Sequence, residues 1–132
     1  MDKNELLRRT KEFSIRVFKL VEKLPKSKAS EVVAFQLLKS SSSVAANYRA
    51  VNRAKSRKDF INKIKVVLEE ADESNFWLSF ISDVGLLMHD DELTFLIQES
   101  DEFIAIFTAA SKTLNKLGSK SSVSKEILNL KS

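Results

Sequence analysis

The apolar residues on either side of the serine run at 40–43 share one helical phase, and this continuity constrains the fold more than any other feature. Serine costs a helix only about 0.5 kcal/mol relative to alanine, and its small side chain lets a neighbouring backbone approach closely. A linker between two domains would break the phase. We therefore predict a single helix over 27–54, whose buried stripe comprises Val33, Leu37, Ser40, Ser41, Val44, Tyr48 and Val51.

The first predicted helix precedes that segment, and the third follows it directly. The first covers 4–24 and ends at Pro25, because proline cannot continue the helical hydrogen-bonding pattern. The third opens where Ser56 can cap its free amides and Asp59 can complete a capping box, and it extends to about 85. The predicted buried residues are Leu6, Thr10, Phe13, Val17, Leu20, Val21 and Leu24 in the first helix, and Phe60, Ile61, Ile64, Val67, Leu68, Ala71, Asn75 and Leu78 in the third.

The fourth predicted helix begins in the acidic sequence DDEL at 90–93, because acidic side chains suit a helix N-terminus. It runs to 117 and ends before Gly118, a residue type common just past the end of a helix. The helical phase predicts that its buried residues are Leu93, Leu96, Ile97, Ile104, Phe107 and Leu114.

Turn-forming residues are scarce, since the 132 residues include only two glycines and one proline. Short connections make consecutive long helices antiparallel neighbours, so we predict an all-α fold: an up-down-up-down antiparallel four-helix bundle over 1–118. Residues 119–132 are predicted to form a flexible C-terminal tail. The absence of cysteine and of any apolar run of about 18 residues argues against disulfides and a membrane span, and we expect a cytoplasmic protein.

Charge is divided unevenly along the chain. Residues 1–65 hold 17 lysines and arginines against 6 acids, residues 66–111 hold 11 acids and no basic residue, and residues 112–132 hold 5 lysines against 1 acid. This segregation predicts either a dipolar monomer or charged faces that match between subunits. Solvated helix faces that merely cluster are the alternative.

The third predicted helix carries a second apolar stripe, nearly opposite its buried one. Large apolar side chains on that stripe need a partner, because a contiguous exposed patch of this kind is rare on a monomer. A loop or the C-terminal tail could cover them, but we favour self-association. The predicted subunit-interface residues are Val66, Trp77, Phe80 and Val84, with Phe95 and Ile106 similarly off-phase on the fourth helix.

The sequence contains few side chains in arrangements that could support catalysis or bind a metal ion. A di-iron bundle needs Glu-x-x-His motifs on facing helices, and the single histidine, His89, has no glutamate three residues before it. The acidic sequence EEADE at 69–73 is therefore interpreted as a charged face. No glycine-rich phosphate loop is present, and no serine lies beside a usable base. We predict a non-enzymatic protein with no cofactor and no metal.

The connection between the second and third predicted helices is strongly basic. Grouped arginines and lysines neutralise phosphates, but the segment has no aromatic ladder for stacking bases, since Tyr48 lies on the buried phase. A solvated or subunit-pairing face is the alternative. The predicted nucleic-acid-binding residues are Arg49, Arg53, Lys55, Arg57, Lys58 and Lys63; Lys65 also lies in this segment, whose single acid is Asp59.

Residues 36–87 resemble the bacterial four-helix-bundle protein family, also called the intervening-sequence proteins because members are encoded within insertions in large-subunit ribosomal RNA genes. The resemblance is carried by QLL at 36–38, ANYR at 46–49, RAKSRKDF at 53–60, and the run from EEADES to DVGLL ending at 87. Ser41 to Ser43 depart mildly from the family, in which many members have glycine or threonine there.

This resemblance implies a four-helix bundle that assembles into a homo-oligomer, with a ring of five as the arrangement associated with the family. The family is similar to the accessory proteins of diversity-generating retroelements, which are basic rings that engage a reverse transcriptase and nucleic acid. No catalytic residue carries over to this chain. Two functions therefore stay open.

The first function is an oligomeric module that binds RNA, such as ribosomal RNA, or another polyanion through the basic connection. The second is a purely structural protein or a protein-protein scaffold, such as an accessory subunit of a nucleic-acid enzyme. In the second case the same arginines would bridge to Glu69, Glu70 and Glu73 of a neighbouring subunit. The two differ in salt behaviour, because phosphate contacts weaken steeply as salt rises.

Overall fold

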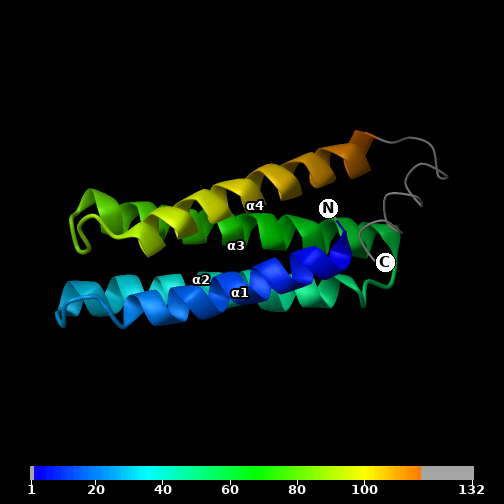
Figure 1. Cartoon of the computed structure of the whole chain (residues 1–132). Helices are drawn as coiled ribbons and strands as arrows, with labels where there is room; N and C mark the ends of the chain where they lie inside the picture. Colours follow the sequence, from blue (N-terminus) through cyan, green and yellow to red (C-terminus); the bar gives the residue numbers. More distant parts are fainter. Residues whose placement is uncertain (1, 117–132) are drawn as a thin grey trace.

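Four helices make up the regular structure between residues 2 and 116, which are the residues that this computed structural model describes. They are α1 (Lys3–Val21), α2 (Lys28–Val51), α3 (Arg57–Asp83) and α4 (Asp91–Lys116). Consecutive helices run antiparallel and pack against each other, and the described residues contain no strand (Figure 1). The predicted all-α, up-down-up-down four-helix bundle is confirmed. The predicted tail at 119–132 lies outside the described residues.

Local side-chain chemistry sets where the helices begin and end. The capping box predicted for α3 is present: the Asp59 amide donates to Ser56 Oγ at 3.0 Å, and Asp59 Oδ2 accepts from the Lys55 amide at 2.9 Å. α1 ends at Val21 and not at the predicted 24, because the ring of Pro25 would clash with the Val21 carbonyl in a continuing helix. The residues that cap the other helix starts are Asp2, Ser27 and Asp90.

The serine run lies in the middle of α2, as its helical phase predicts. Ser40 and Ser41 are buried, whereas Ser42 is exposed. The Ser40 hydroxyl donates to the Leu37 carbonyl oxygen and lies 3.0 Å from the hydroxyl of Ser74 on α3. Small buried residues at facing positions allow α2 and α3 to pack closely. The run is therefore a helix-packing feature and not a linker.

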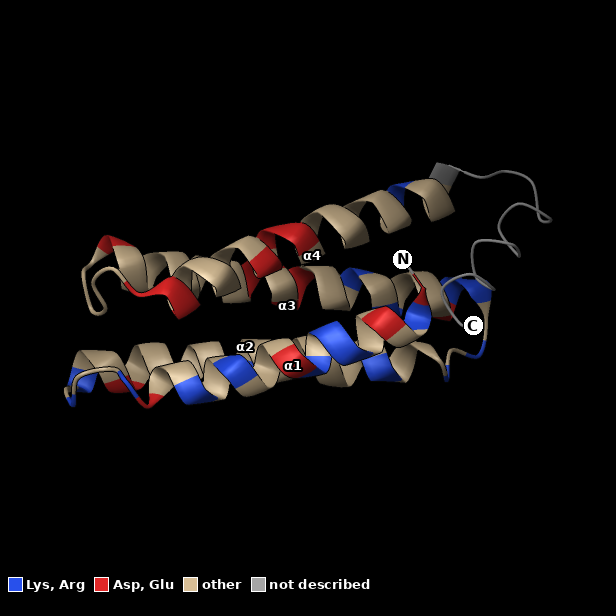
Figure 2. Ribbon diagram, viewed as in Figure 1, with Lys and Arg blue, Asp and Glu red and all other residues tan. Residues whose placement is uncertain are grey.

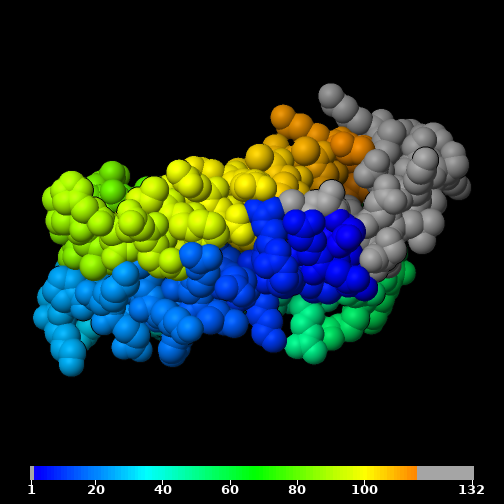
Figure 3. Space-filling model, viewed as in Figure 1, coloured from blue at the N-terminus to red at the C-terminus, as the bar shows by residue number. Residues whose placement is uncertain are grey.

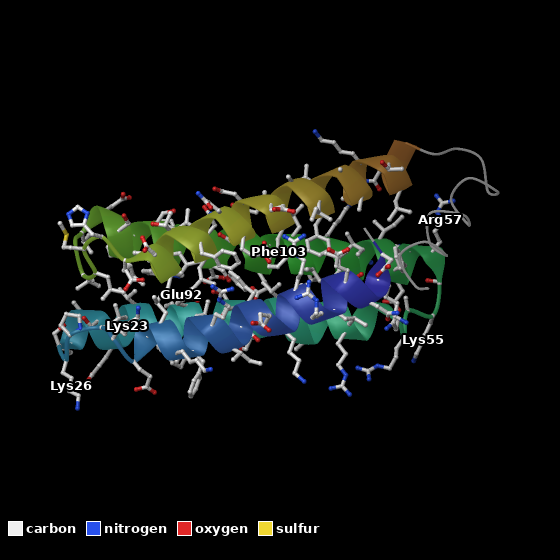
Figure 4. The ribbon with its side chains drawn as sticks, in the orientation of Figure 1. Lys23, Lys26, Lys55, Arg57, Glu92 and Phe103 are labelled. Atoms are coloured by element: carbon white, nitrogen blue, oxygen red, sulfur yellow. The ribbon has the colours of Figure 1, made fainter. Side chains whose placement is uncertain are left out.

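Aromatic rings fill the centre of the bundle. Phe103 is fully buried, and its ring packs edge-on against Phe13 with 5.3 Å between centroids. Tyr48 packs against Phe107 with 5.5 Å between centroids. Figure 4 shows the Phe103 side chain directed into the space between the helices. We call Phe13, Tyr48, Phe103 and Phe107 the interior cluster.

The buried face of α4 is rotated relative to the predicted one. Ile97 and Ile104, predicted to point inward, are only half-buried at the margin of the core, whereas Phe103 is buried and was not predicted. The cause is Ser100, which occupies a fully buried position on the true core stripe. A polar residue at that position interrupts the apolar periodicity on which the prediction rests.

α3 shows a smaller correction of the same kind. Asn75, predicted to be buried, is half-buried at the edge of the α3–α4 contact, and its side-chain amide donates to Ser100 Oγ at 2.8 Å. Ser74, its neighbour, takes the core position. Leu68 and Val21 were also predicted to be buried and are half-buried. A buried polar atom needs a partner, so a bonded amide at the core margin is the lower-energy arrangement.

Ion pairs join α1 to α4, which lie side by side on the face seen in Figure 3. Arg9 Nε donates to Glu99 Oε2 at 3.0 Å, and Arg16 holds both carboxylate oxygens of Glu92, at 2.6 and 2.8 Å. The Arg16 guanidinium also lies 3.8 Å from the ring centroid of Phe95. Hydrogen bonding from Arg16 holds the pKa of Glu92 below its ordinary value. We call these contacts the α1–α4 seam.

Candidate functional site

The connection between α2 and α3 lies at one end of the bundle. Figure 4 shows Lys55 and Arg57 at this end, and Lys23 and Lys26 at the opposite one. Residues 53–58, which we call the basic turn, contain four exposed cations with no acidic partner among the described residues. These cations are Arg53, Lys55, Arg57 and Lys58.

These four cations are among the six residues predicted to bind nucleic acid. The other two, Arg49 and Lys63, lie in different surroundings. Lys63 is half-buried, and its ammonium lies 3.0 Å from Asp59 Oδ1 one helical turn earlier. Arg49 lies in the last turn of α2, four residues before Arg53, and lines a groove between α1 and α2. The structure therefore groups four of the predicted residues in the basic turn, whereas Arg49 lines the groove on α2 and Lys63 is paired with Asp59.

Asp59, the single acid of this segment, is already engaged. It accepts hydrogen bonds from the Lys55 amide and from the Lys63 ammonium. The Lys55 amide is the largest cause of its lowered pKa, and the Lys63 hydrogen bond adds to the effect. The charge of Lys55 also contributes to the lowered pKa of Asp59, but the ion pair that Asp59 forms is with Lys63 and not with a cation of the basic turn.

A pocket of about 590 Å³ opens beside the basic turn at the start of α3. Arg57, Lys58 and Lys65 line it together with the amide side chains of Asn62 and Asn115. Cationic and amide donors at the N-terminal end of a helix favour negatively charged groups. Lys65, the seventh basic residue of the segment, therefore joins the turn cations on this surface.

A cluster of aromatic rings lies on the outer side of α3. Phe76 is 56% exposed, and its ring packs edge-on against Trp77 with 4.9 Å between centroids. Trp77 and Phe80 are half-buried, pack against the core, and lie 5.6 Å apart between centroids. We call Phe76, Trp77 and Phe80 the aromatic ridge. Of the predicted interface residues, Val66 and Val84 flank it with 39% and 53% of their surfaces exposed.

Phe76, the most exposed ring of the ridge, was not among the interface residues predicted from sequence. Acidic residues border the ridge and have no basic partner among the described residues: Glu69, Asp72, Glu73 and Asp83. Asp72 and Asp83 line a hollow of about 300 Å³ with Phe76 and Phe80. The outer side of α3 is therefore both apolar and acidic.

A second apolar surface, also missed, lies between α1 and α2. Two hollows of about 260 and 610 Å³ follow each other along this face and share Ser42, and we call them the outer groove. Small residues, Ser42, Ala45 and Ala46, form part of its lining on α2. Two apolar side chains that line its first hollow, Ile15 and Phe18, are exposed by 44% and 58%, and Val32 and Phe35 on α2 are exposed by 54% and 63%.

Other kinds of site are not supported within the part of the chain that the structure describes. Residues 2–116 contain no group of three or more His, Cys, Asp or Glu side chains arranged to hold a metal ion. None of the described helices is long and apolar enough to cross a membrane. His89 is exposed in the loop between α3 and α4, with a positive φ of 52°.

Comparisons with known proteins agree with this architecture. The family model described as 23S rRNA-intervening sequence protein matches residues 2–109. Among solved structures, the chain is similar to a crystal structure of a protein of unknown function from the S23 ribosomal protein family of Bacteroides thetaiotaomicron. The two are 29% identical with a TM-score of 0.73, and the match covers 82% of this chain and 99% of the other. No curated protein matches the chain.

Proposed function

The chain belongs to the 23S rRNA-intervening sequence protein family, and we propose that it is a non-catalytic, cytoplasmic, self-associating bundle that binds RNA or another polyanion through its basic turn. The observation that carries the proposal is the turn itself. Its four exposed cations gather at one end of the bundle and have no acidic partner among residues 2–116. Each phosphate neutralised by such a cation releases condensed counterions, which favours binding.

The basic turn suits a phosphate backbone better than particular bases. The ring of Tyr48, the nearest aromatic residue before the turn in the sequence, is 1% exposed, and Phe60 after it is fully buried. Without an exposed ring there is no platform on which a base could stack. Lys65 and the amides beside the turn add donors of the kind that contact phosphate oxygens. We therefore propose binding with little sequence preference.

Self-association is the second part of the proposal. The outer side of α3 carries the exposed ring of Phe76, the half-buried rings of Trp77 and Phe80 and two exposed valines, and we propose that a neighbouring subunit covers Val66, Trp77, Phe80 and Val84 together with Phe76. The resemblance to the family suggests a ring of five. In such a ring the basic turns of all copies would lie at one end. One polyanion could then contact several turns, and its overall affinity would exceed that for a single turn because the first contact raises the effective concentration for the next.

A purely structural role is the alternative, and one observation favours it. Arg49 lies outside the basic turn, in a groove that another subunit could cover. Acids on α3, among them Glu69 and Glu73, are exposed without a basic partner among the described residues. In this alternative the chain is a scaffold, such as an accessory subunit of a nucleic-acid enzyme, and does not bind nucleic acid itself.

The test is the triple variant Arg53→Glu, Arg57→Glu and Lys58→Glu, titrated with fluorescent single-stranded RNA at several salt concentrations. The parent should bind with affinity that falls steeply with salt, by about 0.7 logarithmic units of affinity per logarithmic unit of salt for each phosphate contact. The triple variant should lose most of the RNA affinity. The slope of its log affinity against log salt concentration should be smaller than that of the parent by at least about 2, because three phosphate contacts are removed. Its oligomeric mass should not change.

The matched control is Lys19→Glu, Lys26→Glu and Lys28→Glu, which makes the same change in net charge at exposed positions away from the basic turn. This control should retain most RNA affinity if the turn is the site. Equal losses in the two variants would show that net charge and not the turn governs binding. A parent that binds no RNA, combined with a turn variant that falls apart, would establish the structural alternative.

A further inference from the structure

We propose that the outer groove of one copy receives the aromatic ridge of a second copy, so that the copies join head to tail through two different surfaces. The inference rests on the self-association in the proposed function and names the surface that covers the ridge. It is independent of whether the basic turn binds RNA.

The two surfaces have opposite shapes. The ridge presents Phe76 with more than half of its surface exposed, supported from behind by the half-buried rings of Trp77 and Phe80. The outer groove is hollowed where α2 carries small residues, of which Ser42 lines both hollows. Large rings buried among small residues give the close packing that dominates the energy of protein interfaces.

The two surfaces also have opposite charges. Lys11 and Arg49 line the second hollow of the outer groove, whereas Glu69 and Asp72 are exposed acids on the part of α3 that lies at the height of that hollow. Figure 2 shows the wider pattern, with basic residues along α1 and acidic residues along α4 and part of α3. Complementary charge at the rim of an apolar contact fixes its orientation and excludes wrong partners. Arg49, assigned from sequence to nucleic acid, is here a groove residue that faces a neighbour's acids.

Charge also argues against a two-fold contact. In an isologous dimer the same patch meets itself, so ridge against ridge would place Asp72 and Asp83 against their own copies. Groove against groove would oppose Lys11 and Arg49 in the same way, and would leave both hollows unfilled. Only the contact of ridge with groove satisfies shape and charge together.

The aromatic ridge lies at the height of the first hollow of the outer groove, and Glu69 and Asp72 lie at the height of the second. Ser40 on α2 faces Ser74 on α3, and because the two helices are antiparallel, Phe76 stands level with Leu38. Leu38 lines the first hollow of the outer groove with Phe18. A rotation about an axis parallel to the bundle therefore brings ridge and groove together with no shift along it. A heterologous contact of that kind closes into a ring, whereas a shifted one builds a filament.

The experiment uses the absence of cysteine from the chain. Ser79→Cys and Ser42→Cys each place one thiol, beside the ridge and in the groove respectively, and both leave the aromatic rings in place. Each variant is treated with a short bis-maleimide alone, and then after the two are co-refolded as a mixture without RNA. The mixture should give a band at twice the chain mass on a denaturing gel, and each variant alone should stay at the chain mass.

A chain that carries both cysteines should give a ladder whose highest band counts the subunits in the ring. Met88→Cys, at an exposed loop position 69% accessible to solvent, is the control and should link to neither variant. Cross-linking of Ser79→Cys with itself would replace this inference with a two-fold contact. A parent that is monomeric in solution, or an oligomeric mixture without the expected band, would overturn it, whatever the RNA titrations show.

Discussion

Two aromatic clusters with similar ring geometry have opposite surroundings in this molecule. In the interior cluster, Phe13 and Phe103 pack edge-on with 5.3 Å between centroids, and Phe103 has no exposed surface. In the aromatic ridge, Phe76 and Trp77 also pack edge-on, with 4.9 Å between centroids, yet Phe76 is 56% exposed. Ring contacts of this kind therefore do not distinguish a core from an exposed surface.

What separates the clusters is helical phase and neighbouring charge. Phe103 lies on the stripe of α4 that faces the other helices, and the acids beside it on the chain point outward into the α1–α4 seam or solvent. Phe76 lies on the outer side of α3 among acids that have no basic partner among residues 2–116. We infer that the interior cluster holds one subunit together and the ridge holds two subunits together.

The largest effect is expected from Phe103→Ala. Removing a fully buried ring leaves a cavity, and such changes typically cost about 3–5 kcal/mol. The thermal midpoint, followed by circular dichroism, should fall by more than about 10 °C, even in dilute protein. A fall as small as that of an exposed substitution would show that the core closes around the gap, and the distinction between the clusters would lose its main support.

Phe76→Ala makes the same chemical change in the ridge and should act on association instead. Truncating a central interface aromatic commonly costs 2 kcal/mol or more, which weakens association about thirtyfold per contact. Light scattering should show a lower mass while circular dichroism stays helical. If the parent and the variant have the same oligomeric mass, the ridge is not an association surface.

Phe76 is a cleaner probe than the pair Trp77→Ala and Phe80→Ser, which changes two of the interface residues predicted from sequence. Trp77 and Phe80 are half-buried against the subunit's own core. Changing them would weaken the subunit and the contact at once, so a lower mass could not be assigned to either cause. The double variant should reduce both the thermal midpoint and the mass, whereas Phe76→Ala should reduce only the mass in dilute solution.

The sequence predicts those features of the fold that depend on residues within a single helix. The register of α2 through Ser40 and Ser41 and the capping box of Ser56 and Asp59 depend on spacing within one segment, and both were predicted correctly. The phase of α4 failed because Ser100 is buried, and a buried serine looks like a surface residue when only hydrophobicity is read. Its burial depends on which helices surround it.

The candidate sites can likewise be predicted from sequence only where their residues lie in one segment. The four cations of the basic turn are adjacent in sequence, so their grouping is visible without a structure. The pairing of Lys63 with Asp59 could also have been found, because residues four apart face each other on a helix. The outer groove could not, since α1 supplies Phe18 and α2 supplies Leu38 and Ser42. No pattern within one helix reveals a surface that two helices build.

A third aromatic site offers the smallest and most specific test of what surrounds a ring. Phe95 is 39% exposed on α4 and lies under the Arg16 guanidinium, which also binds the Glu92 carboxylate through two hydrogen bonds. Arg16→Gln removes both the contact with the ring and the ion pair. Partly exposed pairs of this type contribute at most about 1 kcal/mol, so the thermal midpoint should fall by about 4 °C or less.

The dependence of that loss on pH separates the two contacts. Hydrogen bonding from Arg16 lowers the pKa of Glu92 in the folded state. The ion pair therefore stabilises the protein fully at pH values above the ordinary glutamate pKa, near 4.3. This stabilisation disappears as the pH falls through the lower pKa of the folded state. The difference in midpoint between parent and Arg16→Gln should therefore shrink between neutral pH and about pH 3. Arg8→Gln, an exposed change on the same helix, should show no such difference at either pH. A difference that persists unchanged at low pH would assign the stabilisation to the stacking of Arg16 on Phe95, because that contact involves no titrating group.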